Sequence, residues 1–137
     1  MLDRNAILNK RPKRLTVHVD EWGDDVMLEA MTIRRRVELL DAILVNEREV
    51  QDYLADQELE EGERAGLAKV DPLDTTVVSL IHSIVNEDGS LMFSMEDYSA
   101  LASLSYQALG SLWLAARSLN DVRPAPEVQS DLKKSSD

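Results

Sequence analysis

Apolar and polar residues alternate with a period of two near the start of the chain. Leu15, Val17 and Val19 are separated by polar residues, which is typical of a half-buried β-strand. A second short apolar run, residues 26–28, follows a stretch rich in Asp and Gly that favours a turn. The pattern predicts a β-hairpin over about residues 15–30. One face of this hairpin must pack on helices, because two strands alone are marginally stable in water.

The spacing then changes to that of an amphipathic helix. Thr32 is a good N-cap, and apolar residues follow it at i, i+4, i+7 and i+11, namely Ile33, Val37, Leu40 and Leu44. Charged residues interrupt the stripe after that point, so we predict a bend or break near Asn46, where Asn46 and Glu49 have capping-box spacing. The acidic residues 56–63 predict either a frayed helix end or a mobile loop.

A second helix is predicted to begin at Asp71 as N-cap, with Pro72 at the first helical position. Its buried face contains Val77, Val78, Ile81, Ile84 and Val85. Residues 86–89 form a predicted turn that ends this helix, and residues 91–93 are predicted to be short and extended.

Two further helices are expected in the last third of the chain. Ser94 and Asp97 have capping-box-like spacing, which predicts a short helix from Met95 to about Ser103. The last helix has one stripe composed of Tyr106, Leu109, Leu112, Trp113, Ala116 and Leu119. Residues 121–137 contain two prolines and no apolar period, so we expect a disordered tail.

These elements predict a mainly α fold in one domain, residues 1–120. A small N-terminal β-hairpin packs on a compact bundle of about four to five helices, and the disordered tail follows. A chain of 137 residues with 44% apolar side chains can bury a hydrophobic core, and an aromatic content of only 4% favours helices over an aromatic-rich barrel.

Charge narrows the classes of partner. The chain has 26 acidic and 15 basic side chains and a formal net charge of −11, so nucleic-acid phosphates and anionic lipid would repel it. Residues 1–19 carry five basic side chains against one acidic, whereas residues 37–64 carry ten acidic against two basic. We expect no nucleic acid, no membrane span and no signal peptide. The opposite charges of residues 1–19 and residues 37–64 could attract each other between neighbouring subunits and let them stack head to tail.

The chemistry of a catalytic or cofactor site is not evident in the sequence. There is no cysteine, the five glycines are scattered, and His18 and His82 lack metal-ligand spacing. No G-x-S-x-G motif occurs. We therefore predict no enzyme activity, no catalytic residues, no metal ligands and no cofactor.

A few residues invite a binding interpretation. Arg34, Arg35 and Arg36 are either an anion contact or a solvated helix face in which Arg34 pairs with Glu38, and we favour the solvated face. Trp22 at the hairpin tip and Phe93 in a linker are each either a core plug or an exposed anchor for a partner. For both residues we favour packing in the core over a role as an exposed anchor.

The order of several short motifs resembles the tail assembly chaperones of long-tailed (siphovirus-type) bacteriophages. The resemblance covers about residues 1–120. It rests on a basic start followed by Val19-Asp20-Glu21-Trp22-Gly23, Ile84-Val85-Asn86-Glu87-Asp88-Gly89, Leu91-Met92-Phe93-Ser94, Glu96-Asp97 and a final helix ending Ser118-Leu119-Asn120.

The resemblance implies a protein that binds the tape measure protein, keeps it soluble and helps tail-tube subunits polymerise around it. It also implies self-association into a ring or spiral, and often a longer frameshifted product that recruits tail tube protein. Such a chaperone works in the cytoplasm of the infected bacterial host and is absent from the mature virion.

From these implications we assign candidate residues. We expect the client to contact Trp22, Phe93, Tyr98 and Tyr106, and we expect Arg34, Arg35 and Arg36 to serve self-association. Two alternatives stay open from the residues alone: an acidic DNA-mimic type inhibitor and a generic helical adaptor protein. A small dimeric enzyme is a third, and it would need a pocket with perturbed titratable groups.

Overall fold

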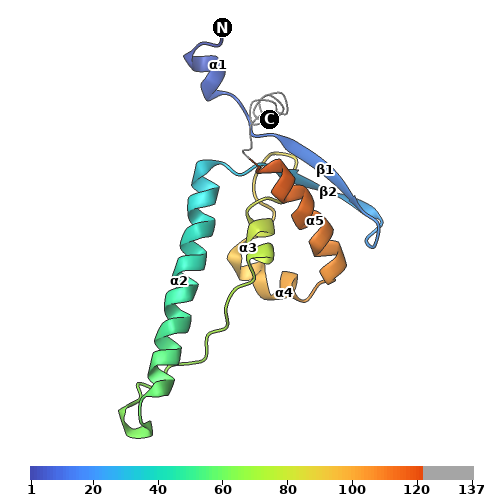
Figure 1. Cartoon of the computed structure of the whole chain (residues 1–137). Helices are drawn as coiled ribbons and strands as arrows, with labels where there is room; N and C mark the ends of the chain where they lie inside the picture. Colours follow the sequence, from blue (N-terminus) through green and yellow to red (C-terminus); the bar gives the residue numbers. More distant parts are fainter. Residues whose placement is uncertain (122–137) are drawn as a thin grey trace, which may run out of the picture.

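The computed structural model describes residues 1–121 and confirms the predicted fold class, which is mainly helical with an N-terminal hairpin. The predicted disordered tail, residues 121–137, lies outside the described residues except for Asp121. In chain order the elements are α1 (Arg4–Leu8), β1 (Arg14–Val19), β2 (Asp24–Glu29), α2 (Ile33–Glu58), the 3₁₀ turn η1 (Glu61–Glu63), α3 (Thr75–Ile81), the 3₁₀ turn η2 (Met95–Asp97), α4 (Tyr98–Ala102) and α5 (Tyr106–Leu119) (Figure 1).

The hairpin forms where the alternation predicts it. Strands β1 and β2 pair antiparallel, with Leu15 opposite Leu28 and Val17 opposite Val26. Gly23 has a φ of 66° in the connecting turn, a left-handed conformation that glycine adopts without steric cost. One face of the hairpin packs on α5 (Figure 1), which gives the two strands the helical support they need.

The predicted break in the long helix is wrong. The Thr32 side chain caps α2 by accepting a hydrogen bond from the Arg35 N–H, and the helix then runs without interruption to Glu58. Asn46 does not start a new helix. Its side-chain amide donates to the Asp71 carbonyl (3.0 Å) and its side-chain oxygen accepts from the Leu73 N–H (2.9 Å). Asn46, a residue type that often caps helices, thus binds a chain segment that is distant in sequence.

The acidic end of α2 is held by one buried carboxylate. Asp56 accepts hydrogen bonds from the backbone N–H groups of Ala65 (2.6 Å) and Leu67 (3.1 Å). These contacts fix the chain as it reverses direction after η1 and returns toward α3 (Figure 1). Of the two expectations for residues 56–63, the frayed helix end is wrong, because α2 continues to Glu58 and η1 follows it. The mobile loop stays a prediction.

Helix α3 is shorter than predicted at both ends. Its N-cap is Asp74, not Asp71, because the Asn46 side chain holds the preceding residues in an extended path. The helix ends at Ile81, and the chain then leaves the helical path. Ile84 and Val85 are buried as expected, but in isolated β-bridges with Leu28 and Leu91.

The last third of the chain follows the sequence more closely. Ser94 and Asp97 form the predicted capping box, and η2 continues directly into α4. Helix α5 is the predicted final helix, although Tyr106 is 93% exposed and does not belong to its buried stripe. The core joins α3, α4, α5 and the hairpin through Val19, Leu28, Val77, Leu80, Ile81, Ile84, Leu101, Ala108, Leu109, Leu112 and Ala116.

Glu29 at the end of β2 connects four segments of the chain. Its buried carboxylate binds Arg14 of β1 (2.7 Å) and Arg35 of α2 (2.9 Å). The same guanidinium groups donate to the carbonyls of Glu87 (2.9 Å) and Gly89 (2.7 Å). Gly89 has a φ of 89°, and a Cβ there would lie 2.7 Å from Arg14 Nη2, so this turn requires glycine.

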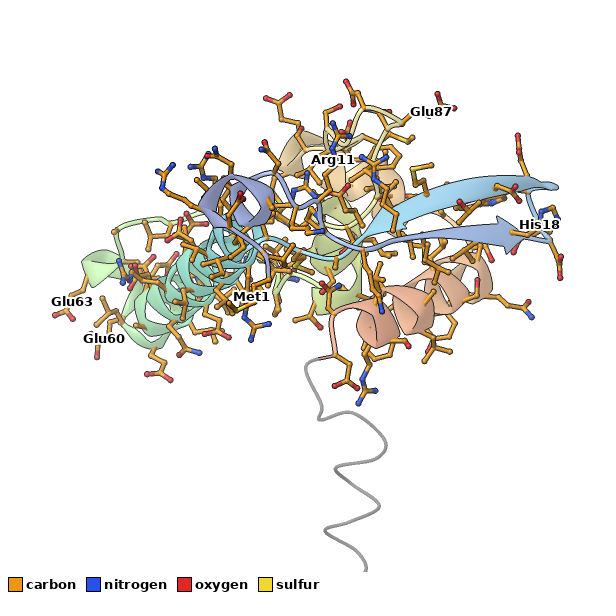
Figure 2. All side chains as sticks on the ribbon, turned by 90° about the horizontal axis from the view of Figure 1, so that it is seen from above. Met1, Arg11, His18, Glu60, Glu63 and Glu87 are labelled. Atoms are coloured by element: carbon orange, nitrogen blue, oxygen red, sulfur yellow. The ribbon has the colours of Figure 1, made fainter. Side chains whose placement is uncertain are left out.

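The molecule is elongated. Seen from above, the hairpin tip near His18 lies at one end and Glu60 and Glu63 at the far end of α2 lie at the other (Figure 2). Between them lies the compact part, while α2 passes beside α3 and projects beyond it (Figure 1). Within residues 1–121, no helix is both long enough and apolar enough to cross a membrane.

Removing the Glu29 carboxylate should destabilise the fold. In Glu29→Ala, two partly buried guanidinium groups lose their anionic partner, which typically costs about 3 kcal/mol. We expect the free energy of unfolding in urea to fall by about that amount. Glu38→Ala, which removes an exposed carboxylate in α2, should change it by less than about 0.5 kcal/mol. Equal effects of the two substitutions would contradict the structural role of Glu29.

Acid should release the segment after α2. The two backbone N–H donors lower the pKa of Asp56 below its usual value. At any pH above the usual pKa of an aspartate, the charged carboxylate therefore stabilises the folded state. This contribution is lost as the pH falls through the lowered pKa. We expect the amide NMR signals of Ala65 and Leu67 to shift together at a pH below the ordinary range for Asp. In Asp56→Asn they should show no such common transition.

Candidate functional site

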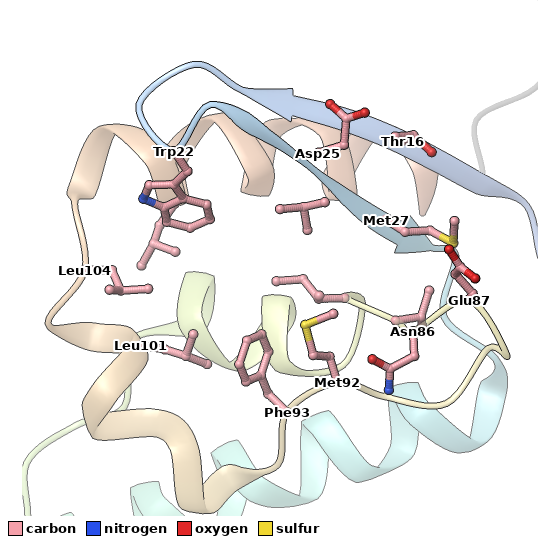
Figure 3. Close-up of a pocket in the computed structure, with 14 residues that line it drawn as sticks. Thr16, Trp22, Asp25, Met27, Asn86, Glu87, Met92, Phe93, Leu101 and Leu104 are labelled. Atoms are coloured by element: carbon pink, nitrogen blue, oxygen red, sulfur yellow. The ribbon is translucent and has the colours of Figure 1, made fainter.

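A groove of about 690 Å³ lies between the hairpin, the 84–93 segment and the α4–α5 corner (Figure 3). Most of its lining is apolar: Trp22, Val26, Met27, Ile84, Val85, Met92, Phe93, Leu101, Leu104 and Leu109. Trp22, Met92 and Leu104 are each between 41% and 48% exposed, so the groove opens to solvent. An open apolar groove of this kind is suited to receive side chains of another polypeptide.

The hairpin supplies one wall and is anchored at its tip. Trp22 lies in the turn between β1 and β2, where its backbone N–H donates to the Val19 carbonyl (3.0 Å). Next to it, the Glu21 carboxylate accepts a hydrogen bond from the hydroxyl of Ser105, the N-cap of α5 (2.6 Å). This contact holds the tip over the α4–α5 corner, and Trp22 and Leu104 therefore meet at one end of the groove (Figure 3).

The opposite wall is built by backbone pairing rather than by a helix. The Val85 N–H donates to the Met27 carbonyl (3.0 Å) and the Met92 N–H donates to the Ile84 carbonyl (3.1 Å). These bonds extend the hairpin sideways with two short segments and place Met92 and Phe93 across from the strands (Figure 3). Two methionines, Met27 and Met92, line the groove, and flexible thioether side chains adapt to ligands of different shape.

The polar rim of the groove carries negative charge. Asp25 of β2 and Glu87 of the 86–89 turn both line it (Figure 3). His18 Nδ1 lies 2.8 Å from Asp25 Oδ1, and this hydrogen bond raises the pKa of His18 because the carboxylate stabilises the protonated ring. In the 86–89 turn, hydrogen bonds from Ser90 lower the pKa of Asp88. Asp25 is therefore already paired with His18, and Glu87 is the rim acid that makes no ion pair among residues 1–121. Its charge favours a cationic group on a ligand.

Of the four aromatic residues predicted to contact a partner, the structure brings two together. Trp22 and Phe93 line the same groove. The Tyr98 hydroxyl accepts a hydrogen bond from the Asp74 N–H (2.7 Å) and so fastens the start of α3 to α4. Tyr106 is exposed beside Trp113, in a hollow of about 420 Å³ that adjoins the groove and shares Leu104 and Leu109 with it. Phe93 packs against the core while Trp22 is partly exposed, so core packing and a place in the groove coexist.

The three arginines predicted to serve self-association differ from one another. Arg35 is engaged with Glu29 and the Gly89 carbonyl. Arg34 and Arg36 are exposed, and the considered pairing of Arg34 with Glu38 is not among the ion pairs of residues 1–121. Of the three arginines, Arg35 is the one that makes an ion pair among residues 1–121, and its partner is Glu29 at the end of β2.

Several groove residues were not identified from the sequence. Leu104 lies between two helices, outside any apolar period, and Met92 and Met27 belong to short extended segments. Leu104 and Met92 share one signal, an apolar residue in a connection, where a buried role is not required, whereas Met27 is an ordinary strand residue of β2. Only the packing of the hairpin over the α4–α5 corner gathers them on one surface (Figure 3).

The two histidines belong to different elements and do not share a site. His82 is buried and its Nδ1 is 2.8 Å from the Val78 carbonyl within the same helix, whereas His18 is on the hairpin. Among the described residues, no group of three or more His, Asp or Glu side chains is placed to hold a metal ion.

Comparison with known proteins adds no relative. A scan against protein-family models, a search of curated proteins and a search of solved structures each gave no match.

Proposed function

We propose that this protein is a tail assembly chaperone of a long-tailed bacteriophage, which holds the tape measure protein through the groove between the hairpin and the α4–α5 corner. The observation that carries the proposal is the apolar groove with Trp22 and Phe93 on its walls. The order of sequence motifs that resembles this family provides the identity of the client.

The chemistry of the groove supports a helical client. An amphipathic helix inserts apolar side chains at i, i+3, i+4 and i+7 into such a groove, and the main anchors are large apolar groups. Trp22 is a rigid aromatic anchor, while Met27 and Met92 can repack around different side chains. A chaperone that holds a very long client needs this tolerance, because it meets many different segments of the client.

Charge supports the same client. Glu87 on the rim, which makes no ion pair among residues 1–121, would attract a basic residue beside the apolar face of the bound helix, whereas Asp25 is already paired with His18. The net charge of −11 keeps a complex with an apolar client soluble through mutual repulsion. A holder of this kind performs no covalent chemistry, so the proposal includes no catalytic residue and no cofactor.

The wider role follows from the resemblance. The chaperone would act in the cytoplasm of the infected host, keep the tape measure protein soluble until tail tube protein polymerises around it, and leave before the virion is complete. A ring or spiral of chaperone copies along the client, and a longer frameshifted product that recruits tube protein, belong to this proposal.

Co-expression tests the proposal. We expect the tape measure protein of the same phage to be insoluble alone, and soluble and co-purified when this chain is present. The double variant Trp22→Ser/Met92→Ser replaces two partly exposed groove residues on opposite walls and should reduce the co-purified client at least about tenfold, because two anchors are lost. A client that stays insoluble with the wild-type chain would disprove the proposal.

A matched control separates the groove from general surface effects. Tyr106→Ser removes an aromatic residue that is more exposed than Trp22 and lies outside the groove. If the groove is the main site, this variant should retain the client. Equal loss with Tyr106→Ser and with the groove variant would contradict a contact confined to the groove.

A further inference from the structure

Helix α2 exposes a continuous apolar stripe. Ile33, Val37, Leu40 and Leu44 are 84%, 58%, 45% and 60% exposed, and their i, i+4, i+7, i+11 spacing places them on one side of the helix. Isolated exposed apolar residues are common on protein surfaces, but four in register on one helix face indicate a surface that another structure covers.

The opposite side of α2 is the one that faces the protein. Leu39 is buried, Asn46 binds residues 71 and 73, and Arg35 binds Glu29. The stripe therefore points away from α3. It continues sideways onto α5, because Leu40 also lines a hollow of about 770 Å³ together with Trp113 and Leu114. The apolar surface is thus broader than a single row of side chains.

The spacing of the stripe is that of a coiled-coil seam. Alternating steps of four, three and four residues repeat every seven, which is the pattern of two helices packed side by side. In an antiparallel pair of identical stripes, Ile33 faces Leu44 of the second copy and Val37 faces Leu40. A two-fold axis repeats these contacts, and all four residues of both copies are covered. Polar Glu47 and Gln51 end the seam.

The charges beside the stripe are self-complementary in the antiparallel direction. Arg34 and Asp41 occupy the same flank, seven residues apart, and neither makes an ion pair within residues 1–121. Antiparallel packing places Arg34 of one copy beside Asp41 of the other, and the two-fold axis creates this contact a second time. It also brings a carboxylate near the first turn of α2, which carries arginines and no acid at the positive end of the helix dipole.

We infer that a second copy of this chain covers the α2 stripe, as an antiparallel two-fold pair with Arg34 bound to Asp41 of the second copy. The contact of this pair lies on α2, and no α2 residue lines the groove. A two-fold contact is closed. It therefore joins two copies, and a ring or spiral would require an additional contact elsewhere.

Sedimentation velocity of the full chain over a range of concentrations tests the pair. We expect a species of twice the 15.4 kDa chain mass. Leu44→Glu places a charge in both outer layers of the seam and should raise the dimer dissociation constant at least about 100-fold, about tenfold for each layer. Circular dichroism of each variant verifies that the monomer is folded.

Val45→Glu is the matched control, because Val45 is 45% exposed on the same helix but lies about 100° around it from Leu44. We expect less than about a threefold change. A wild-type chain that is monomeric at all concentrations, or equal effects of the Leu44 and Val45 variants, would overturn the inference.

Charge reversal tests the direction of the pair. Arg34→Glu and Asp41→Arg should each weaken dimerisation by about three- to tenfold at low salt, because each creates two like-charge contacts. The double variant Arg34→Glu/Asp41→Arg should restore it. A parallel pair would bring Asp41 beside Arg36 of the second copy, so failure of the double variant to recover would overturn the antiparallel assignment. The outcome does not depend on the tape measure protein, so it is separate from that of the proposed function.

Discussion

The ion triad of Arg14, Glu29 and Arg35 is the contact on which the arrangement of the domain depends. It joins both strands to α2, and through the carbonyls of Glu87 and Gly89 it also holds the turn after the 84–85 segment. The carboxylate is buried, so each arginine compensates a charge that water no longer solvates. This single group of charges therefore holds the first turn of α2, the hairpin and the second wall of the groove together, while Thr32 caps the start of α2.

The consequence for function is a molecule with two separate apolar surfaces. The groove lies beneath the hairpin and draws its residues from the strands, α4, α5 and the connections between them, whereas the α2 stripe lies on one face of a single long helix. Client binding and self-association would then proceed without competing for the same residues. In the proposed role, each copy of the inferred pair would hold a client segment while it contacts its partner.

The fold class could be read from the residue pattern, since hairpin and helices each have a local period. The errors occurred where a residue that normally serves a local contact serves a distant one. Asn46 looks like a helix cap but binds the chain at residues 71 and 73, and Asp56 looks like part of a solvated acidic run but accepts two distant backbone N–H groups. Asp71 and Pro72 have the right types for a helix start, yet α3 begins after Asp74 because Asn46 holds the preceding residues.

The sequence by itself determined the helical class, the position of the hairpin, the Ser94 capping box and the apolar stripe of α2, because each of these depends on neighbours within about one or two helical turns. Tertiary structure alone decided that Trp22 and Phe93 share one groove while Tyr98 and Tyr106 do not. It also decided that the stripe faces outward. Burial is a property of the whole packed chain: the same spacing of apolar residues fits a core helix or an exposed interface, and only the position of the other segments distinguishes the two.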